Sequence, residues 1–392
     1  MEHNRVILKK GKEFPIKNRH HWIFSGAVQS FPEYNNGDIL EVQSYSGEFL
    51  GHAYFNKITS ISGRMLNFDK TPPLDSVKIN IQNAVKLRNK IFKDDVTNCY
   101  RVINSEGDYI PGLIVDKYND VLVIQINTLG ISLIRDVIVN CLLENYGERI
   151  SSIYEKSNSN ARKQDGIKPF EGHIYGDKKQ NIKVLENGIP FMVDVVNGQK
   201  TGLFLDMREM RKLVMEHSAG KSVLNCFSYS GGFSVYASKG GATKTTSVDI
   251  SKEAIAQAKN NFEMNKMDLN KNQLVVADVF EYLKANDLNY DIVILDPPAF
   301  AKKKSDIYNA KKGYMEINRD ALSKMPRGSS LLTSSCSYYI DEQTFKDIVY
   351  SSARAAGRSL KLISKHRLAP DHPINTHHKE SIYIKSLFLT VL

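Results

Sequence analysis

The sequence predicts an α/β protein of three domains, and its C-terminal domain is expected to be a Rossmann-like, doubly wound parallel sheet. Three observations support this fold class. Short strand-like runs occupy residues 1–73, helices and strands mix over residues 74–185, and strands alternate with helices over residues 186–392. We therefore expect a small β-barrel, an α+β central domain and an α/β domain, in that order.

The first two domains are predicted from hydrophobic patterning between Gly, Pro and Asn residues that mark turns. The strands expected in the small barrel lie at residues 6–8, 22–24, 38–42 and 49–54. In the central domain we expect helices over residues 75–92 and 131–146, and a strand over residues 121–126. Because helices and strands are mixed in this segment, the central domain is predicted as α+β.

The third domain has a regular alternation of strands and helices, which is typical of a parallel sheet. Its strands are expected at residues 222–226, 245–249, 273–276, 290–295 and 330–334, with the last ones near 361 and within 381–392. Its helices are expected at residues 232–239, after Ser251 as the N-cap, and at 341–356.

The charge of the chain favours a polyanionic partner. The formal net charge is +10, from 53 Lys and Arg against 43 Asp and Glu, and basic side chains neutralise phosphates. No apolar run is long enough to cross a membrane, and the first residues carry no apolar signal core. We therefore expect a cytoplasmic protein. None of the 4 cysteines forms a Cys-x-x-Cys pair, so no metal site is expected.

The residues predicted to carry chemistry follow successive strands of the third domain, where parallel sheets bind ligands. A loop with Phe227, Tyr229 and Gly231 follows the first strand and lets the backbone approach a ligand. Asp249 ends the second strand and can accept both hydroxyls of a ribose. Asp278 follows the third strand and can accept from an adenine amino group. These acids predict a nucleoside-containing cofactor.

The loop lacks the Gly-x-Gly-x-x-Gly spacing that fits the pyrophosphate of a dinucleotide. S-adenosylmethionine has no pyrophosphate and accepts a looser loop. This difference argues against a nicotinamide dehydrogenase and favours a methyltransferase. Asp296, followed by two prolines, ends the fourth strand at the same edge of the predicted sheet.

Several blocks of the sequence resemble the bacterial large-subunit rRNA cytosine-C5 methyltransferase I family. They are residues 199–208, 227–234, 296–300 and 335–337 in the third domain, 101–103 and 106–116 in the central domain, and 21–26, which resembles the family's PUA domain. The resemblance covers essentially the whole chain. It implies a PUA domain, a central domain and a class I S-adenosylmethionine-dependent methyltransferase domain acting on 23S rRNA, with a homodimer as a possible assembly.

The resemblance also implies roles for individual residues. Cys336 corresponds to the nucleophile that adds to C6 of cytosine, and Asp296 would hydrogen-bond N3 of the activated ring. Residues expected near the cofactor are Lys200, Thr201, Phe204 and Arg208. The chain departs from the family at Asn225, where an Asp is usual. It also departs at residues 108–112, which read Asp-Tyr-Ile-Pro-Gly where the family has Asp-Gly-Leu-Pro-Gly.

Basic residues beside aromatics suggest where RNA binds, because they can hold phosphates and stack bases. The candidates are Lys10, Arg19 and Trp22 near the N-terminus and Lys302 and Lys303 after the Asp-Pro-Pro motif. A solvated basic surface is the other interpretation of these lysines.

Two other functions remain open at this stage. The Asp-Pro-Pro-Ala-Phe motif, residues 296–300, also resembles the Asp-Pro-Pro-aromatic motif of amino-group methyltransferases, which need no cysteine. A non-catalytic RNA-binding or ribosome-assembly factor could also keep this fold. Cys336 favours the cytosine-C5 reaction over the first, and the acids at the strand ends favour an enzyme over the second. The other cysteines, Cys99, Cys141 and Cys226, are expected to be buried hydrophobic residues.

Overall fold

The computed structural model describes residues 5–392, and its contacts divide the chain into two compact units. The first unit comprises Met1–Gly188, Val193–Asp206 and Ala369–Ile382, and the second comprises Ile189–Met192, Met207–Leu368 and Tyr383–Leu392. Residues 1–4, part of the stretch from which a cytoplasmic location was expected, lie outside the described residues. The division into three domains, at residues 73 and 185, stays a prediction, because one compact unit can hold more than one domain.

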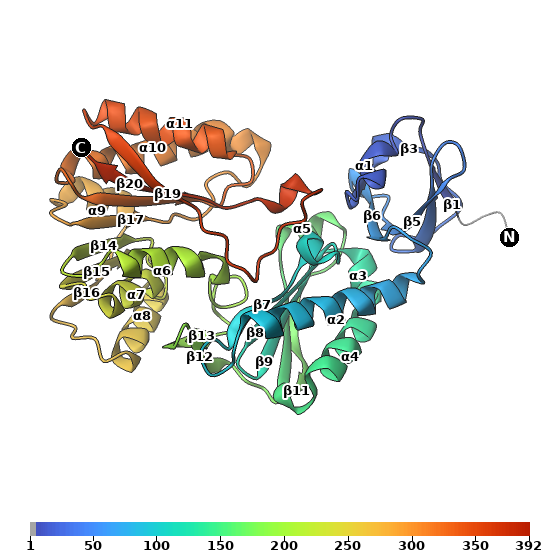
Figure 1. Cartoon of the computed structure of the whole chain (residues 1–392), viewed down its shortest axis with the longest axis horizontal. Coiled ribbons are helices and arrows are strands. Elements are labelled where there is room, and N and C mark those ends of the chain that lie inside the picture. Colours follow the sequence, from blue (N-terminus) through green and yellow to red (C-terminus); the bar gives the residue numbers. More distant parts are fainter. Residues whose placement is uncertain (1–4) are drawn as a thin grey trace. The chain divides into compact units, whose positions relative to one another are not determined.

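The N-terminal part of the first unit is a six-stranded sheet with the strand order β2-β6-β5-β4-β1-β3 (Figure 1). Its elements are β1 (Arg5–Leu8), α1 (Phe14–Lys17), β2 (Trp22–Phe24), β3 (Val28–Ser30), β4 (Ile39–Gln43), β5 (Phe49–Phe55) and β6 (Ile61–Asn67). Alternate side chains of these strands, such as Val6 and Leu8, are fully buried in one hydrophobic core. The four strands expected from the sequence are all present.

The central part of the first unit is a five-stranded sheet, β11-β10-β9-β8-β7, packed against helices. Its elements are α2 (Pro73–Ile91), β7 (Cys99–Asn104), β8 (Leu113–Tyr118), β9 (Val121–Ile126), α3 (Leu129–Leu133), α4 (Arg135–Tyr146), β10 (Ser152–Ser157), α5 (Asn160–Gln164) and β11 (Phe170–Gly176). The next two strands, β12 (Asn181–Glu186) and β13 (Ile189–Asp194), form a separate two-stranded sheet. The single helix predicted over residues 131–146 is wrong. Ile134, with φ −106° and ψ 17°, leaves the helical region and separates α3 from α4.

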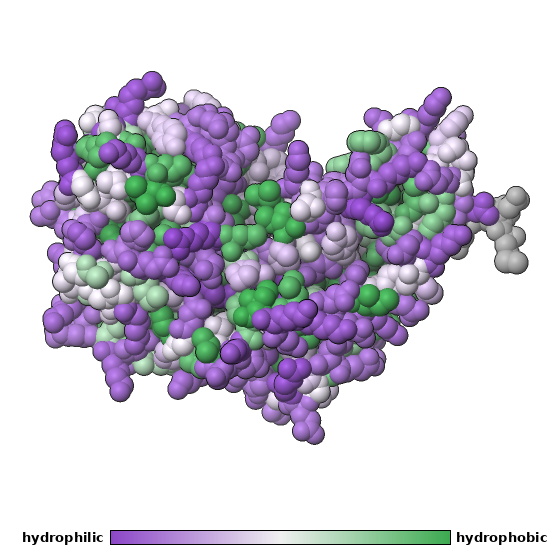
Figure 2. Space-filling model, in the orientation of Figure 1, coloured by the Kyte–Doolittle hydropathy of each residue, from purple (hydrophilic) through white to green (hydrophobic). Residues whose placement is uncertain are grey.

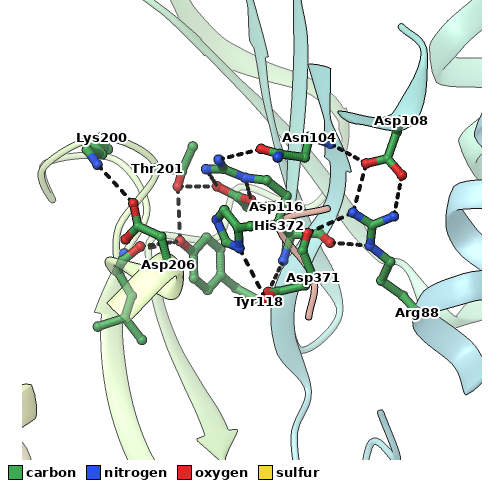
Figure 3. Close-up of polar contacts among 12 residues, drawn as sticks. Arg88, Asn104, Asp108, Asp116, Tyr118, Lys200, Thr201, Asp206, Asp371 and His372 are labelled. Atoms are coloured by element: carbon green, nitrogen blue, oxygen red, sulfur yellow. Dashed lines mark hydrogen bonds and ion pairs between the residues drawn. The ribbon is translucent and has the colours of Figure 1, made fainter. Parts of the chain in front are cut away.

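A buried network of charges connects distant segments of the first unit (Figure 3). Arg88 of α2 is fully buried, and its guanidinium donates to both carboxylate oxygens of Asp108, at 2.5 and 2.8 Å. The same guanidinium donates to the carbonyl oxygen of Asp371 at 2.7 Å, while the Asp371 carboxylate accepts from the backbone N–H of Arg101 at 2.8 Å. These bonds hold the segment Ala369–Ile382 to α2 and β7.

The second unit is a seven-stranded sheet with the strand order β16-β15-β14-β17-β18-β20-β19. Its strands are β14 (Ser222–Cys226), β15 (Lys244–Asp249), β16 (Asn272–Val276), β17 (Ile292–Leu295), β18 (Ser330–Ser335), β19 (Leu360–Lys365) and β20 (Lys385–Val391). The first five strands pair in parallel, and β20 runs antiparallel to its two neighbours. β14 is the topological switch point, because the chain proceeds from it toward β16 and later returns to β17 on its other side.

Helices cover both faces of this sheet (Figure 1). They are α6 (Arg208–Glu216), α7 (Gly232–Lys239), α8 (Lys252–Met264), α9 (Val279–Ala285), α10 (Ile307–Lys324) and α11 (Glu342–Ala355). α9, α10 and α11 bury Leu283, Tyr314 and Phe345 against the strands in one core, whereas α7 packs on α6 and α8. The α/β fold class is confirmed, and the five parallel strands begin and end within two residues of their predicted bounds. Ser251 caps α8 as expected, because its hydroxyl accepts from the N–H of Ala254.

The face of the molecule seen in Figure 2 is mostly hydrophilic, with hydrophobic residues in small groups. Among the described residues, no helix has the length and apolar character that are needed to span a membrane.

Loss of the Arg88 side chain should destabilise the first unit. In Arg88→Met, Asp108 would stay buried without its cation, which typically costs about 3 kcal/mol or more. We expect the melting temperature of this unit in scanning calorimetry to fall by about 6 °C or more. Lys17→Met is the control, because Lys17 pairs with Glu48 at the exposed surface and such pairs contribute less than about 1 kcal/mol. Equal melting temperatures for the two variants would contradict a structural role for the network.

Candidate active site

The loop between β14 and α7 has the shape expected of a ligand-binding turn. Phe227, Tyr229 and Gly231 all adopt positive φ, at 58°, 47° and 76°. These left-handed residues turn the backbone sharply. Backbone bonds fix the loop: the N–H of Ser228 donates to the carbonyl oxygen of Val248 at 3.0 Å, and the N–H of Gly231 donates to the carbonyl oxygen of Ser228 at 2.9 Å.

Asp249, at the end of β15, organises this loop. Its carboxylate accepts from the N–H of Tyr229 at 2.8 Å with one oxygen and from the N–H of Ser251 at 2.9 Å with the other. A carboxylate has about four lone-pair sites, so two such bonds leave capacity for further donors, such as ribose hydroxyls. Ile250, the next residue, is 68% exposed and offers an apolar surface beside this carboxylate.

Two buried polar atoms near the loop lack a partner among the described residues. Asn225 is buried at the end of β14, and its amide donates to the hydroxyl of Ser234 at 3.1 Å. Its carbonyl oxygen Oδ1 accepts no hydrogen bond, and the hydroxyl of Ser228 is also unpartnered. Buried polar atoms usually have partners, so these two atoms suit a bound ligand that carries both donors and acceptors. The ammonium group of a bound amino-acid moiety can donate a hydrogen bond to Asn225 Oδ1, although the Asn225 side chain itself is uncharged.

Two other predicted cofactor residues occupy structural positions. Asp278 is exposed and caps α9, where its Oδ1 accepts from the N–H of Glu281 at 3.2 Å. One carboxylate oxygen remains for other contacts, so its assignment to the adenine stays a prediction. Arg208 begins α6 and is fully buried.

Cys336 follows β18, and the serines on both sides hold it in place. The hydroxyl of Ser335 donates to the phenol oxygen of Tyr314 at 2.9 Å, and the phenol shares a hydrogen bond of 2.9 Å with the hydroxyl of Ser337. The Ser337 hydroxyl also accepts from the N–H of Ala301 at 3.1 Å, which connects this triplet to the loop after β17. The Ser-Cys-Ser triplet is therefore a fixed element of the site.

The Cys336 thiol lies beside the residue that follows Asp296. Its Sγ is 4.0 Å from the carbonyl oxygen of Pro297. Cys336 is half-buried, whereas Cys99, Cys141 and Cys226 are buried. Burial raises the pKa of the Cys226 thiol well above its usual value, so that thiol stays protonated.

A buried lysine reaches the same triplet. Lys385 of β20 is 5% exposed, and its Nζ donates to the carbonyl oxygens of Ser337 at 2.7 Å and Tyr383 at 2.8 Å. Burial lowers the pKa of Lys385 to about 8, and the neighbouring Cys336 acts in the opposite direction. The attraction is mutual, so an ammonium at Lys385 favours the thiolate form of Cys336.

The family of this chain follows from comparison with known proteins. Residues 169–374 match the family of S-adenosylmethionine-dependent methyltransferases, and residues 6–68 match a PUA-like domain. The chain is 36% identical to "Ribosomal RNA large subunit methyltransferase I" of Aliivibrio fischeri, covering 99% of both chains. It is 38% identical to the protein of the same name from Aeromonas hydrophila, covering 97% of this chain and 98% of that one. The chain belongs to the ribosomal RNA large subunit methyltransferase I family. Its methyl donor is S-adenosylmethionine.

Solved structures agree with this assignment. A putative methyltransferase from Streptococcus mutans is 28% identical, with a TM-score of 0.85 over 99% of this chain and 100% of that one. A putative methyltransferase solved in complex with SAH is also 28% identical, with a TM-score of 0.87 over the same shares. The Rossmann-like methyltransferase domain and the PUA-like domain predicted for this chain are therefore confirmed.

Three predicted cofactor residues of this methyltransferase lie in the first unit (Figure 3). The hydroxyl of Thr201 donates to Asp116 Oδ2 at 2.6 Å and lies 3.0 Å from the phenol oxygen of Tyr118. Lys200 pairs with Asp206 at 3.6 Å, and its ammonium lies 4.6 Å from the ring centre of Phe204. The assignment of Lys200, Thr201 and Phe204 to the cofactor stays a prediction.

The candidate RNA-binding residues of the first unit differ in exposure. Lys10 is exposed, and Arg19 is exposed with its guanidinium 5.2 Å from the ring centre of Phe68. Trp22 is half-buried, and its indole N–H donates to Glu106 at 2.9 Å. The Trp22 side chain also lines a cavity of 540 Å³ together with Glu106 and Arg64.

Lys302 and Lys303 are exposed in the second unit. Their backbone N–H groups both donate to the Asp306 carboxylate at 3.1 Å, which orders the turn and leaves the side chains in solvent. All five RNA-binding assignments stay predictions.

Sequence reasoning missed several residues that shape the site. Lys385 and Tyr314 are distant from Cys336 in the sequence and reach it only through the fold. The exposed apolar Ile250 could have been noticed, because it directly follows the predicted ribose-binding acid. No pattern in the sequence marks Lys385, since a single lysine in a strand is ordinary.

The loop geometry gives a test of cofactor binding. Gly231 has φ +76°, and a Cβ there would lie 2.8 Å from Phe262 Cε1. In Gly231→Ala, left-handed strain of about 1–2 kcal/mol and this overlap should displace the loop and weaken S-adenosylmethionine binding about tenfold or more in calorimetry. Gly357→Ala is the control, because Gly357 has φ +65° but a Cβ added there would meet no atom within 4 Å. Unchanged affinity in both variants would argue against the loop as the cofactor site.

Proposed function

We propose that this methyltransferase forms 5-methylcytidine in 23S rRNA through a covalent bond between Cys336 and C6 of the target cytosine. One observation carries the proposal. Cys336 is the half-buried thiol of the four, and its neighbours Ser335 and Ser337 are fixed to Tyr314 at the carboxyl edge of the sheet, where ligands bind in such folds.

Cytosine C5 is a weak nucleophile, so the reaction needs a thiolate first. The Cys336 thiolate would add to C6, which forms an S–C6 bond and gives C5 the electron density of an enamine. S-adenosylmethionine, when bound, would supply the electrophilic methyl group for C5 and would leave as S-adenosylhomocysteine. Transfer of the C5 proton to a base then restores the C5–C6 double bond and expels the Cys336 thiolate, so the enzyme returns to its starting state.

Asp296 would act on the same ring from the neighbouring strand end. β17 and β18 are paired in parallel, so Asp296 and Cys336 follow adjacent strands. A carboxyl group at Asp296 can share a proton with N3 of cytosine and favour addition at C6. The thiol of Cys336 and the carbonyl oxygen of Pro297, 4.0 Å apart, bring the two strand ends together.

Lys385 would stabilise the nucleophile. Two carbonyl oxygens hold its ammonium by hydrogen bonds, and its charge interacts with Cys336 more strongly than with the Asp341 carboxylate. Positively charged neighbours within a few ångströms typically lower a thiol pKa. We infer that Lys385 is a positioning and electrostatic residue for the thiolate.

The cofactor would be held by the loop and acids around β14 and β15. Asp249 would accept the ribose hydroxyls, Asn225 would accept from the ammonium, and the backbone at Phe227, Tyr229 and Gly231 would approach the cofactor closely. Roles for Lys200, Thr201, Phe204, Arg208 and Asp278 are proposed from the family resemblance. A cytoplasmic location and a homodimer are likewise proposed on that basis.

Replacement of the nucleophile provides the decisive test. Cys336→Ala should lower methylation of 23S rRNA by about 10³-fold or more, because no other group can add to C6. It should still bind S-adenosylmethionine, as measured by calorimetry. The wild type should form a covalent complex with RNA that contains 5-fluorocytidine, because fluorine prevents the final elimination, and Cys336→Ala should form none.

Cys226→Ala is the control for this test, since burial keeps the Cys226 thiol protonated. It should still form the covalent complex. Full turnover by Cys336→Ala would disprove the C5 mechanism and favour transfer to an amino group. Phe300 is the aromatic residue of the Asp-Pro-Pro-aromatic motif on which that alternative rests. The centroid of its ring lies 4.6 Å from that of Tyr314.

The pH dependence should report on Lys385. The folded pKa of about 8 lies below the usual value for lysine, so the ammonium is present below about pH 8 and is lost above it. The rate of adduct formation should therefore stop rising, or fall, as the pH increases through 8. In Lys385→Met the Cys336 thiol pKa should rise by about one unit or more, which lowers the rate at pH 7 about tenfold.

Lys361→Met is the matched control, because Lys361 is exposed on the neighbouring β19. It should keep the pH–rate profile of the wild type. Identical profiles for the wild type and Lys385→Met would exclude an electrostatic role for Lys385, and circular dichroism would show whether the variant is folded.

A further inference from the structure

Three side chains from distant parts of the sequence meet at one point in the first unit. His20 precedes β2, whereas His378 and Glu380 belong to the segment Ala369–Ile382. One nitrogen of each histidine and one Glu380 carboxylate oxygen all lie within 4.8 Å of one another. His20 Nε2 is 3.3 Å and His378 Nδ1 is 3.9 Å from the same carboxylate oxygen, Glu380 Oε2.

His378 is the unusual member of this cluster. Its side chain is only 1% exposed, yet neither ring nitrogen has a hydrogen-bond partner among the described residues. A buried polar group without a partner costs about 1–3 kcal/mol, so such groups are rare unless a ligand or water satisfies them. The His378 ring lies 4.5 Å from the ring of His20 and 4.6 Å from that of Trp22, measured between centroids. Neither of these rings makes a hydrogen bond with His378.

The donor set fits a borderline divalent ion better than a hard one. Two imidazole nitrogens and one carboxylate oxygen suit Zn²⁺, whereas Ca²⁺ and Mg²⁺ prefer oxygen ligands. Two ligands at about 2.1 Å from a tetrahedral ion lie about 3.4 Å apart. The separation of 3.3 Å between His20 and Glu380 meets this spacing, and the separation of 3.9 Å for His378 is within a small side-chain rotation of it.

The surroundings also favour a cation. Nδ1 of His20 lies 3.1 Å from the N–H of Trp22, from which it can accept, and 3.3 Å from the carbonyl oxygen of Trp22, to which it can donate. An ion at Nε2 requires the second tautomer, in which Nδ1 carries the proton and Nε2 has a free lone pair. Glu106, which accepts from the Trp22 indole, adds a second negative charge to the neighbourhood. Glu380 is 30% exposed, which leaves a route for the ion and for solvent as a fourth ligand.

We propose that His20, His378 and Glu380 form a binding site for a divalent transition-metal ion, for which Zn²⁺ is the best fit. The three ligands leave one coordination position open to solvent. The ion connects residues that are 360 positions apart in the sequence, so it fastens the segment Ala369–Ile382 to the N-terminal sheet. Its role is structural, and the site takes no part in the methyl-transfer chemistry described above.

The test uses the untagged, full-length protein. After incubation with Zn²⁺ and removal of the free ion, elemental analysis should find about one more Zn²⁺ per chain in the wild type than in His378→Ala. Titration calorimetry with ZnCl₂ should show affinity that falls at least about tenfold in His378→Ala and in Glu380→Gln. Zn²⁺ should raise the melting temperature of the wild type and leave that of His378→Ala unchanged.

His377→Ala is the matched control, because His377 is the adjacent histidine, is exposed, and lies outside the cluster. It should bind Zn²⁺ as the wild type does. Glu380→Gln keeps the volume of the side chain and its ability to accept from His20, so it remains informative if His378→Ala fails to fold. Equal Zn²⁺ affinity for the wild type, Glu380→Gln and any folded His378→Ala would overturn the proposal. Loss of methylation without loss of Zn²⁺ binding, as expected for Cys336→Ala, separates this site from the catalytic one.

Discussion

The pairing of β14 with β15 on one side and with β17 on the other is the constraint on which the catalytic unit depends. Register across these strands sets Cys226 opposite both Val248 and Leu295, so the next residues of all three strands emerge at one edge. Asp249 and Asp296 arise there, and Cys336 follows one strand farther along. A shift of register by one residue would move each side chain of a strand to the opposite face of the sheet and separate the strand ends that form the site.

The loop after β14 lies at the same edge of the sheet, and its backbone is strained. Left-handed conformations at Phe227 and Tyr229, which lack the freedom of glycine, typically cost about 1–2 kcal/mol each. Asp249 offsets part of this cost by accepting from the N–H of Tyr229. A loop with a fixed shape before the cofactor binds avoids the entropy of ordering it during binding. The acid at the end of β15 thus serves the loop and, as we propose, the ribose.

Most of the fold was predictable because periodicity is local. Strands of the parallel sheet are continuous apolar runs, such as Ile292–Leu295. Ser251 marks the start of α8 because serine is a common N-cap residue. The break at Ile134 was missed because both sides of it continue the helical pattern. The partners of Cys336 were missed for a different reason. Lys385 and Tyr314 reach the thiol only through strand order and helix packing, which one sequence does not reveal.

Burial has different consequences for the thiols of Cys226 and Cys336. Burial would favour the neutral forms of both a thiol and a lysine, and for Cys226 it does so without opposition. At Cys336 the half-buried thiol lies near the ammonium of Lys385, and each charge makes the other less costly. The two carbonyl oxygens that hold Lys385 orient its ammonium without neutralising it, unlike the carboxylate that pairs with Arg88. A lysine with a pKa of about 8 keeps its positive charge at neutral pH but loses it after a small rise in pH. Such a lysine suits the Cys336 thiolate, which must be both formed and expelled in each catalytic cycle.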